Sequence, residues 1–502
     1  MTLFGRPLAE IGPVVSMALC AGAVPLLVLF RKLPNLREAT SLLVAVTNFA
    51  LVLFLYDAWK RGVPIGTHIA TLAPGFQLAF RADALGLLFA LVASGLWILN
   101  TLYSIGYMRA HHEQHQTRFY ACFALSIAAV MGAAFAKNAF TMFAAYEVLS
   151  LVTYPLVIHA QTPEARAGAK RYLTYLLGTS IGFQLPALFL VWHLGNGSLD
   201  FTTGGLLHGS TASAGLLTFT FVLYVAGLAK CAVMPFHGWL PAAMVAPTPV
   251  SALLHAVAVV KMGVFGVSRV VLDVFGTDTL SRIGANDILI GAACFTIVVA
   301  SLIALAQDNL KRRLAYSTIS QLSYVLLGVA LLVPAGVTGG IAHIGAHAVS
   351  KITLFFAAGA IYVAVHKTKV SELDGLARRM PITMTAFAVG ALAMIGLPPA
   401  ATMISKDWLL KGAADGPNAF VLVVLGTSAL LNAAYFLPIV WRAFFKPLPE
   451  GAPTGRQEAP WPCVVALAAT ALLTIALFLF PDGLLHLAQE AAGYVATHGG
   501  GH

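Results

Sequence analysis

Titratable side chains recur inside long apolar stretches of this sequence. An acid or a base in apolar surroundings loses its hydration, so function is its default explanation in a membrane segment. Burial disfavours the charged form, a nearby opposite charge favours it, and histidine titrates near neutral pH, so such groups can pass protons. The candidates for a proton path are Glu147, Lys230, His255, Lys261, His343, His347, Lys351 and Lys406, with Asp407, Pro235 and Pro398 as secondary members.

The spacing of three candidates places them on one face of a helix. His343, His347 and Lys351 follow one another at intervals of four residues, which is close to one helical turn. A polar stripe on an otherwise apolar helix is expected to face a hydrated interior. His255 and Lys261 are six residues apart, so we expect their side chains to point in different directions.

Each candidate also has a structural interpretation. Glu147 could form an ion pair that only fixes helix packing, and Lys230 and Lys261 could extend their amines to a membrane surface. Lys406 could lie at the outer interface if its span ends early. The default for ionisable groups inside a membrane favours function for these four residues. For His255, a packing role and a relay role stay equally open.

The composition indicates what kind of fold must position these groups. Of the 502 residues, 59% are hydrophobic and 10% are charged, whereas soluble domains carry roughly 25% charged residues. The apolar residues form blocks close to the ~20 residues that cross a bilayer as a helix. Because backbone polar groups in a bilayer must be bonded internally, we predict an all-α polytopic membrane protein.

The apolar blocks divide into about fourteen predicted spans. Two of them, 214–235 and 382–405, contain helix-breaking prolines. Interrupted helices in the two halves of a chain indicate an internally repeated transporter with its site near the middle of the bilayer. The polar run Tyr316–Gln321 could cap a helix or admit water. The predicted spans are 11–30, 39–58, 83–107, 119–136, 138–159, 172–193, 214–235, 249–272, 288–306, 316–334, 339–364, 382–405, 419–441 and 461–481.

The basic residues lie mainly in the connections on one predicted side. The net charge is +10, yet the connections 194–213 and 335–338 and the tail 482–502 contain no lysine or arginine. The connection 59–82 is an exception, with three such residues. The positive-inside rule then predicts a multi-pass protein of the cell inner (plasma) membrane with both termini on the non-cytoplasmic side. This distribution disfavours nucleic-acid binding.

The sequence shows no apparatus for redox or nucleotide chemistry. Its five cysteines are scattered and form no C-x-x-C pair. It contains neither G-x-G-x-x-G nor a Walker A motif. We therefore expect no cofactor, no metal and no catalytic redox site in this chain.

Five stretches around the candidate residues resemble a known family. They are YEVLSLVTYPLV around Glu147, MPFHGWLPAAMVAPTPVSALLHAVAVVKMGVF at 234–265, AQDNLKRRLAYSTISQLSYVLLG at 306–328, HAVSKITLFFAAGAI at 347–361 and GLPPAATMISKDWLL at 396–410. They are similar to the antiporter-like, proton-conducting subunits of respiratory complex I (L, M and N) and of Mrp cation/proton antiporters (A and D). The chain looks most like a D-type subunit, and the long lateral helix of the L subunit is not expected.

The resemblance implies fourteen core helices, with two inverted five-helix repeats and broken helices 7 and 12. The chain then divides into 1–118 with helices 1–3, 119–272 as the first repeat with helices 4–8, 288–441 as the second repeat with helices 9–13, and 461–502 as helix 14 and a tail.

The resemblance also implies roles for single residues. Glu147 matches a helix 5 glutamate that pairs with Lys230, and Lys261 matches the central lysine of helix 8. In helix 11 the family has a relay, and helix 12 carries a terminal residue. These positions correspond to His343, His347 and Lys351, and to Lys406.

The expected function is proton translocation by one membrane subunit of a complex-I-like, Mrp-like or energy-converting hydrogenase-like assembly. The resemblance implies other membrane subunits as partners and a driving force from a peripheral redox arm, as in NADH-quinone oxidoreductase, or from exchange against Na⁺. Three alternatives stay open: the D-type component of a Na⁺/H⁺ antiporter proper, a membrane subunit that energises a soluble partner in inorganic-carbon uptake, and a scaffold whose buried charges only hold helices together. A stand-alone solute carrier is disfavoured.

Overall fold

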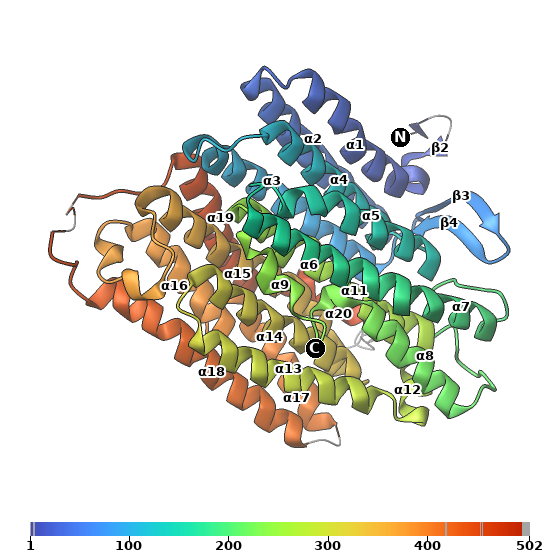
Figure 1. Ribbon diagram of the computed structural model, residues 1–502. Coiled ribbons are helices and arrows are strands. Elements are labelled where there is room, and N and C mark those ends of the chain that lie inside the picture. The colour runs from blue at the N-terminus through green and yellow to red at the C-terminus, as the bar shows by residue number, and fades with distance from the viewer. Residues whose placement is uncertain (1, 4–5, 417–418, 452, 454, 494–502) are drawn as a thin grey trace, which may run out of the picture.

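The computed structural model describes residues 2–3, 6–416, 419–451, 453 and 455–493. Within these ranges, eleven helices are long and apolar enough to cross a membrane. The chain is therefore a polytopic helical membrane protein (Figure 1), as its composition predicts. The predicted count of fourteen spans is not confirmed, because the helices at 214–235, 316–334 and 382–405 are shorter or more polar than these eleven.

A small hairpin lies between the second and third long helices in the sequence. The predicted connection 59–82 contains two antiparallel strands, which pack beside the ends of the neighbouring helices. The side chain of Asp83 caps the third helix by accepting a hydrogen bond from the Gly86 amide. The elements are β1 (Thr2–Leu3), β2 (Arg6–Pro7), α1 (Leu8–Leu29), α2 (Pro34–Lys60), β3 (Gly66–Ala73), β4 (Phe76–Arg81) and α3 (Ala84–Ala110).

The next group of helices contains several changes of helical pitch. One long helix, Pro163–Leu194, passes through a π-helical turn, and another, Thr248–Phe275, passes through two. The elements are α4 (Gln116–Ala134), α5 (Ala139–Val157), α6 (Pro163–Thr179), η1 (Ser180–Gln184), α7 (Leu185–Leu194), α8 (Ala214–Gly227), η2 (Ala229–Cys231), α9 (Trp239–Ala242), η3 (Ala243–Val245), α10 (Thr248–Ala252), η4 (Leu253–Val257), α11 (Val259–Arg269), η5 (Val270–Phe275) and α12 (Thr277–Ile283).

The remaining helices close the bundle. A short helix, α20, lies in the predicted tail and packs on α3 and on the long helix α15. The elements are α13 (Asn286–Ala306), α14 (Leu310–Ala330), α15 (Pro334–Val365), η6 (Val370–Glu372), η7 (Leu376–Arg378), α16 (Pro381–Ile395), α17 (Ala401–Asp415), α18 (Ala419–Phe445), α19 (Trp461–Leu479) and α20 (Asp482–Ala491).

Both predicted interruptions are present. α8 ends at Gly227 and is followed by the short turn η2, an irregular segment containing Pro235, and α9. α16 ends at Ile395, Pro398 lies in the gap, and α17 begins at Ala401. Proline lacks an amide hydrogen and clashes with the preceding turn. Pro398 therefore fits the end of α16 at Ile395, whereas α8 ends at Gly227, eight residues before Pro235.

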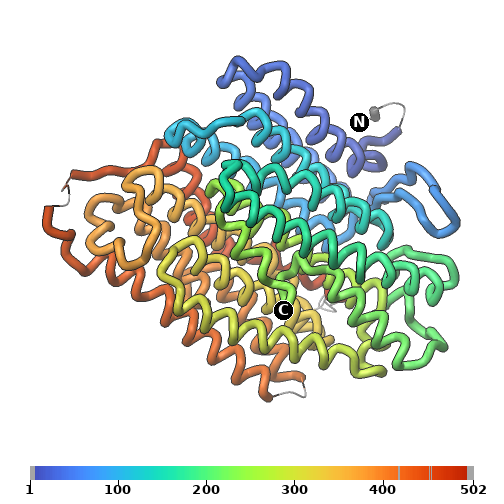
Figure 2. The backbone as a smooth tube through the Cα atoms, viewed as in Figure 1, coloured from blue at the N-terminus to red at the C-terminus, as the bar shows by residue number. Residues whose placement is uncertain are grey.

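The core of the molecule lies around α10, α11 and α15. The most apolar window of Thr248–Phe275 is completely buried, and from Gly336 to Ile361 every residue of α15 is buried. By contrast, α1 and α2 form an outer hairpin, shown in blue at one edge of the backbone trace (Figure 2). The candidate residues are thus carried mainly by the innermost helices.

The connections rich in arginine and lysine lie at one end of the molecule, which we call the basic end. Arg109, at the end of α3, donates to Asn35 at the start of α2 at 2.6 Å. Asp308, between α13 and α14, accepts a hydrogen bond from the Ser371 hydroxyl at 2.8 Å. Arg442 of α18 donates to Asp374 at 2.6 Å. These contacts join connections that are distant in sequence.

Candidate functional site

Lys230 is held by α5 at the first helix break. The break frees the backbone of residues 229–231 from a regular helix, and α5 and α9 satisfy it. The Lys230 amide donates to the hydroxyl of Tyr146 at 3.1 Å, and the Trp239 indole donates to the Ala229 carbonyl at 3.0 Å. The fully buried ammonium donates to the Tyr146 carbonyl at 2.8 Å and to Ser150 Oγ at 2.6 Å. It also lies 3.1 Å from the centroid of the Tyr146 ring.

Glu147 occupies a different position from its expected partner. Its side chain is half-buried, and its neighbours Val148 and Leu151 are 47% and 54% exposed on the flank of the bundle. Oε1 of Glu147 is buried without a hydrogen-bond partner. Within the described part of the chain, no ion pair joins Glu147 to Lys230. The structure therefore shows the two groups on neighbouring elements and apart.

The central contact joins α11 to α15. Lys261 is fully buried, and its Nζ lies 2.7 Å from Nδ1 of His347. The His347 ring stacks on that of His343, with centroids 5.6 Å apart and planes inclined by 10°. The spacing of four residues along α15 produces this stack. Nε2 of His347 is buried without a partner among the described atoms.

His343 continues the contacts toward α14 and α17. Its Nδ1 lies 2.8 Å from Ser405 Oγ and its Nε2 lies 3.1 Å from Gln321 Oε1. The amide nitrogen of Gln321 donates to the Met394 carbonyl at 3.3 Å and to Asn432 Oδ1 at 3.2 Å. A single buried amide therefore joins His343 to the second helix break.

Lys406 completes this set at the second break. α16 ends at Ile395, and the last carbonyls of a helix have no partner within the helix. Lys406 Nζ donates to the Met394 carbonyl at 2.7 Å and to the Ile395 carbonyl at 3.1 Å. The interruption therefore creates the acceptor site that holds the lysine inside the bundle.

Lys351 branches off this series. It lies one turn beyond His347 on α15, and its Nζ donates to Ser317 Oγ of α14 at 2.9 Å. The hydroxyl of Tyr435, from α18, donates to the same oxygen at 3.1 Å. No hydrogen bond joins Lys351 to His347 within the described residues.

The other predicted residues lie outside the series. His255 is fully buried in the π-helical turn η4, both its ring nitrogens lack a partner among the described atoms, and its ring lies against that of Phe355 with centroids 4.7 Å apart. Asp407 is 54% exposed and pairs with Lys411 at 2.7 Å, outside the contacts of Lys406. Pro235 and Pro398 lie in the breaks themselves.

The contacts form one continuous chain over part of the predicted path, which we call the central chain. It runs from Lys261 through His347, His343, Gln321 and the Met394 carbonyl to Lys406. All its side chains are buried. Lys230 and His255 are not joined to it by any hydrogen bond within the described residues.

Several residues of the site were not predicted. Tyr146 and Ser150 are four residues apart in the segment around Glu147, a spacing that places them on one helix face. Asn432 is a polar amide inside the predicted span 419–441, so its position in the sequence could also have indicated a residue of the site. Ser405 precedes Lys406 directly. Their roles depend on packing between helices, which the periodicity of one segment does not report.

Two glycine positions allow close backbone contacts around the first helix break. A Cβ on Gly263 of α11 would lie 2.0 Å from the backbone nitrogen of Cys231. A Cβ on Gly227 would lie 2.3 Å from the backbone nitrogen of Gln184. Only glycine allows backbones to approach this far, so η2 is packed directly against α11.

Two family models match the chain. A model described as NADH:quinone oxidoreductase/Mrp antiporter, TM matches residues 136–432. A second, described as NADH-Ubiquinone oxidoreductase (complex I), chain 5 N-terminus, matches residues 72–120. The first match contains the Lys230 site and the whole central chain.

Individual proteins give the same result. NADH-quinone oxidoreductase subunit N of Desulforudis audaxviator is 32% identical over 81% of this chain and 80% of its own length. NAD(P)H-quinone oxidoreductase chain 5 of Picosynechococcus sp. is 29% identical over 86% of this chain, which spans only 66% of that relative. A chain in the structure of the Mrp complex from Dietzia sp. DQ12-45-1b has the same fold, with a TM-score of 0.83 and 23% identity over 96% of this chain and 98% of that one.

Proposed function

Because the chain belongs to the family of transmembrane subunits shared by NADH:quinone oxidoreductases and Mrp antiporters, we propose that it translocates protons as one membrane subunit of a larger assembly. The observation that carries the proposal is the central chain. It holds two lysines, two histidines and an amide in direct succession, all of them buried. Buried ionisable groups in a membrane are costly and are retained for function.

The first transfer in this proposal occurs between Lys261 and His347. A proton passes between two groups when they share a hydrogen bond, and the 2.7 Å distance from Nζ to Nδ1 provides one. The stacked rings of His347 and His343 do not share a hydrogen bond directly, so the next transfer needs a bridging water and the release of one of the two bonds that His343 makes to Ser405 and Gln321. The unpartnered Nε2 of His347 supplies a polar atom for such a water.

The Lys230 site serves as the control element. Its ammonium is bound by a carbonyl and a hydroxyl of α5. The Glu147 carboxylate, one residue after Tyr146, makes no ion pair with this ammonium, and its Oε1 has no hydrogen-bond partner among the described atoms. We infer that Lys230 exchanges between this neutral site and Glu147. The exchange would change the charge near Lys261, because η2 packs directly on α11.

The proposal includes partners and an orientation. The basic end faces the cytoplasm of the plasma membrane, and both termini lie on the opposite side, because the positive-inside rule favours that arrangement. Other membrane subunits adjoin the bundle. The driving force comes from redox chemistry in partner subunits or from exchange against Na⁺.

Inverted membrane vesicles containing the complete assembly provide the test. Acidification is followed with a pH-sensitive dye in the wild type, in Lys261→Met and in Lys411→Met. Lys411 is an exposed lysine on α17, paired with Asp407 outside the central chain, so it is the matched control. We expect Lys261→Met to abolish acidification and Lys411→Met to retain it, with normal assembly in both.

The outcomes separate the alternatives. Normal acidification in Lys261→Met would leave only the scaffold interpretation. Acidification that depends on added Na⁺ would indicate an Mrp-type exchanger, and acidification that depends on a quinone reductant would indicate a redox-driven pump. Recovery of a single soluble partner, with no other membrane subunit, would favour the carbon-uptake alternative.

A further inference from the structure

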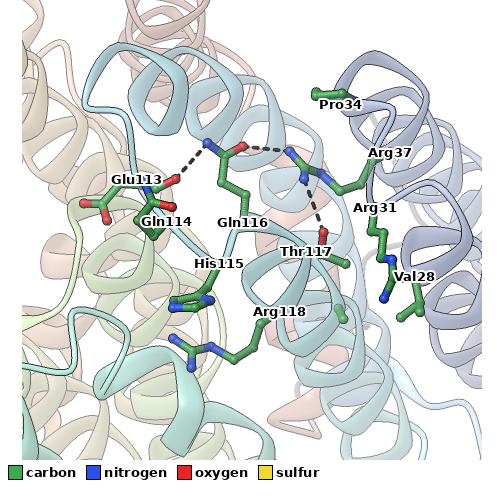
Figure 3. A pocket seen from close by; sticks show the side chains of 11 residues that line it. Val28, Arg31, Pro34, Arg37, Glu113, Gln114, His115, Gln116, Thr117 and Arg118 are labelled. Atoms are coloured by element: carbon green, nitrogen blue, oxygen red, sulfur yellow. Dashed lines mark hydrogen bonds between the residues drawn. The ribbon is translucent and has the colours of Figure 1, made fainter.

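A cleft of about 660 Å³ lies at the basic end, between the turn that joins α1 to α2 and the loop that joins α3 to α4 (Figure 3). It is separate from the central chain, since none of its lining residues belongs to that chain. Its walls include the ends of α1, α2 and α4. The cleft is therefore at the level where helices leave the apolar layer.

Three arginines line this cleft, and their charges are only partly balanced. Arg37 is buried, donates to Gln116 at 2.7 Å and to Thr117 at 3.3 Å, and lies 3.6 Å from Glu38. Its Nε has no partner among the described atoms. Arg31 makes no hydrogen bond or ion pair through its side chain within the described residues.

Arg118 and its surroundings add to the positive potential. Arg118 donates to the His159 carbonyl at 3.0 Å, and its buried Nε has no partner among the described atoms. Burial, together with the positive charges of Arg118 and His115, lowers the pKa of His159 to about 4. The one acid in the lining, Glu113, turns toward His111 at 3.1 Å and His159 at 3.6 Å.

The first turn of α4 opens toward the same cleft. His115 is its N-cap residue, with a φ of 55° and no capping hydrogen bond from its side chain, and the first turn contains no acidic residue. The free amides of a helix N-terminus favour an anion. The Arg37 guanidinium, which donates to Gln116 and Thr117 and lies 5.4 Å from the centroid of the Tyr120 ring, adds a positive charge beside this turn.

Two apolar residues also line the cleft. Val28, in the last turn of α1, is 49% exposed, and Ala121 of α4 also lines the cleft. Because α1 and α2 form the outer hairpin of the bundle (Figure 1), this part of the cleft continues into the lipid-facing surface. A ligand that fits both the basic and the apolar residues carries an anionic group and a hydrocarbon chain.

We propose that this cleft binds an anionic phospholipid, with its phosphate at Arg31 and the first turn of α4 and an acyl chain along Val28 and Ala121. Basic pockets between membrane helices suit anionic headgroups, and arginine matches the geometry of phosphate oxygens. The bound lipid would join the outer α1–α2 hairpin to α4.

The test uses phosphatidylglycerol with a photoactivatable group in its acyl chain, incorporated into nanodiscs with the complete assembly. Cross-linked peptides are identified by mass spectrometry. We expect adducts on the α1 end and on the start of α4. Arg31→Gln should reduce them by more than about fivefold, because the loss of a direct phosphate contact adds to the general contribution of one basic residue near a membrane surface.

Two further variants make the result specific. Lys32→Gln removes the same charge one residue away, at a side chain that does not line the cleft, and should reduce the adducts by no more than the general factor of about fivefold. Ala121→Trp fills the apolar part of the cleft without changing charge and should remove them. Because the Arg31 side chain makes no polar contact within the described residues, its replacement leaves folding intact.

Four outcomes would overturn the proposal. Equal labelling by a phosphatidylcholine probe would show that the headgroup charge is not recognised. An equal loss of adducts in Lys32→Gln would show that the lipid responds to the overall positive charge of the basic end and not to the cleft. Displacement of the probe by inorganic phosphate would make the cleft a site for a soluble anion. Absence of adducts at both segments would exclude a lipid there.

Discussion

Nζ of Lys261 lies 2.7 Å from Nδ1 of His347, and this contact is the direct link between α11 and the imidazole pair of α15. The two atoms can form a hydrogen bond only when one donates a proton that the other accepts. In the proposed function, a proton enters the histidine pair at this contact.

Replacing His347 should interrupt the central chain. In His347→Ala, Lys261 loses its acceptor and His343 loses its stacking partner, so we expect dye-detected proton movement in vesicles to fall at least about tenfold. His366→Ala is the control, because His366 ends the same helix at the basic end. Equal transport in the two variants would contradict a role for His347 in transfer.

Removing the hydroxyl of Ser317 should affect the branch at Lys351. Ser317→Ala deletes the acceptor 2.9 Å from Lys351 Nζ and leaves a buried ammonium without this bond, which costs about 1–3 kcal/mol. Ser323→Ala, on the same helix, removes only a bond to the Ile319 carbonyl of its own helix. We expect slower transport and a lower thermal midpoint in the first variant alone, measured on the purified assembly.

The Lys230 site can be tested through Ser150. Ser150→Ala removes the acceptor 2.6 Å from Lys230 Nζ but keeps the Tyr146 carbonyl and ring. If Lys230 exchanges between this site and Glu147, the substitution favours Glu147 and should alter the dependence of transport on pH. Thr153→Ala is the control, because Thr153 is on the same helix as Ser150 but its hydroxyl lies 2.6 Å from that of Tyr172 on α6. Identical pH profiles in both variants would count against the exchange.

Acid should weaken the ion pairs that Asp374 forms with Arg442 and Lys446 at the basic end. Burial opposes the charged form of Asp374, but hydrogen bonds and charges from Arg442 and Lys446 outweigh it and hold the pKa of that carboxyl below its usual value. Such a group stabilises the fold above its ordinary pKa near 4, and the contribution disappears as the pH falls through the lowered value.

Asp374→Asn should therefore lower the thermal midpoint at pH 7, by an amount equivalent to about 1 kcal/mol or less because the pair is partly exposed. The difference from the wild type should shrink as the pH falls below 4. Midpoints measured between pH 7 and pH 3 test this, with Asp415→Asn as a control. A constant difference across that range would exclude the ion pair as its cause.

The helical pattern predicts the architecture well because each membrane segment satisfies its own backbone. Both breaks were predicted from segments that contain Pro235 and Pro398, although a proline does not always end a helix, since Pro155 and Pro438 lie inside continuous ones. The hairpin β3–β4 was not predicted. The residues 59–82 were identified only as a connection between two apolar spans, and that assignment says nothing about their secondary structure. The contacts between its strands come from turn geometry and pairing.

The site could be predicted only in part. The interval of four residues predicts that His343, His347 and Lys351 share a face of α15, and the structure places all three in the interior. The same interval does not reveal that Lys351 lies about 6 Å further along the axis than His347, where it meets Ser317 in place of Lys261. Partners on other helices follow from packing alone.

The position of Gly263 has a mechanical consequence. Its Cα lies so close to the Cys231 backbone that no side chain fits between them, and neither element can shift without pushing the other. The two elements that carry Lys230 and Lys261 are therefore in direct backbone contact and cannot approach one another further. In the proposed function, the movements that make and break proton-transfer contacts are therefore expected at two places: between Lys230 and α5, and between Lys261 and α15.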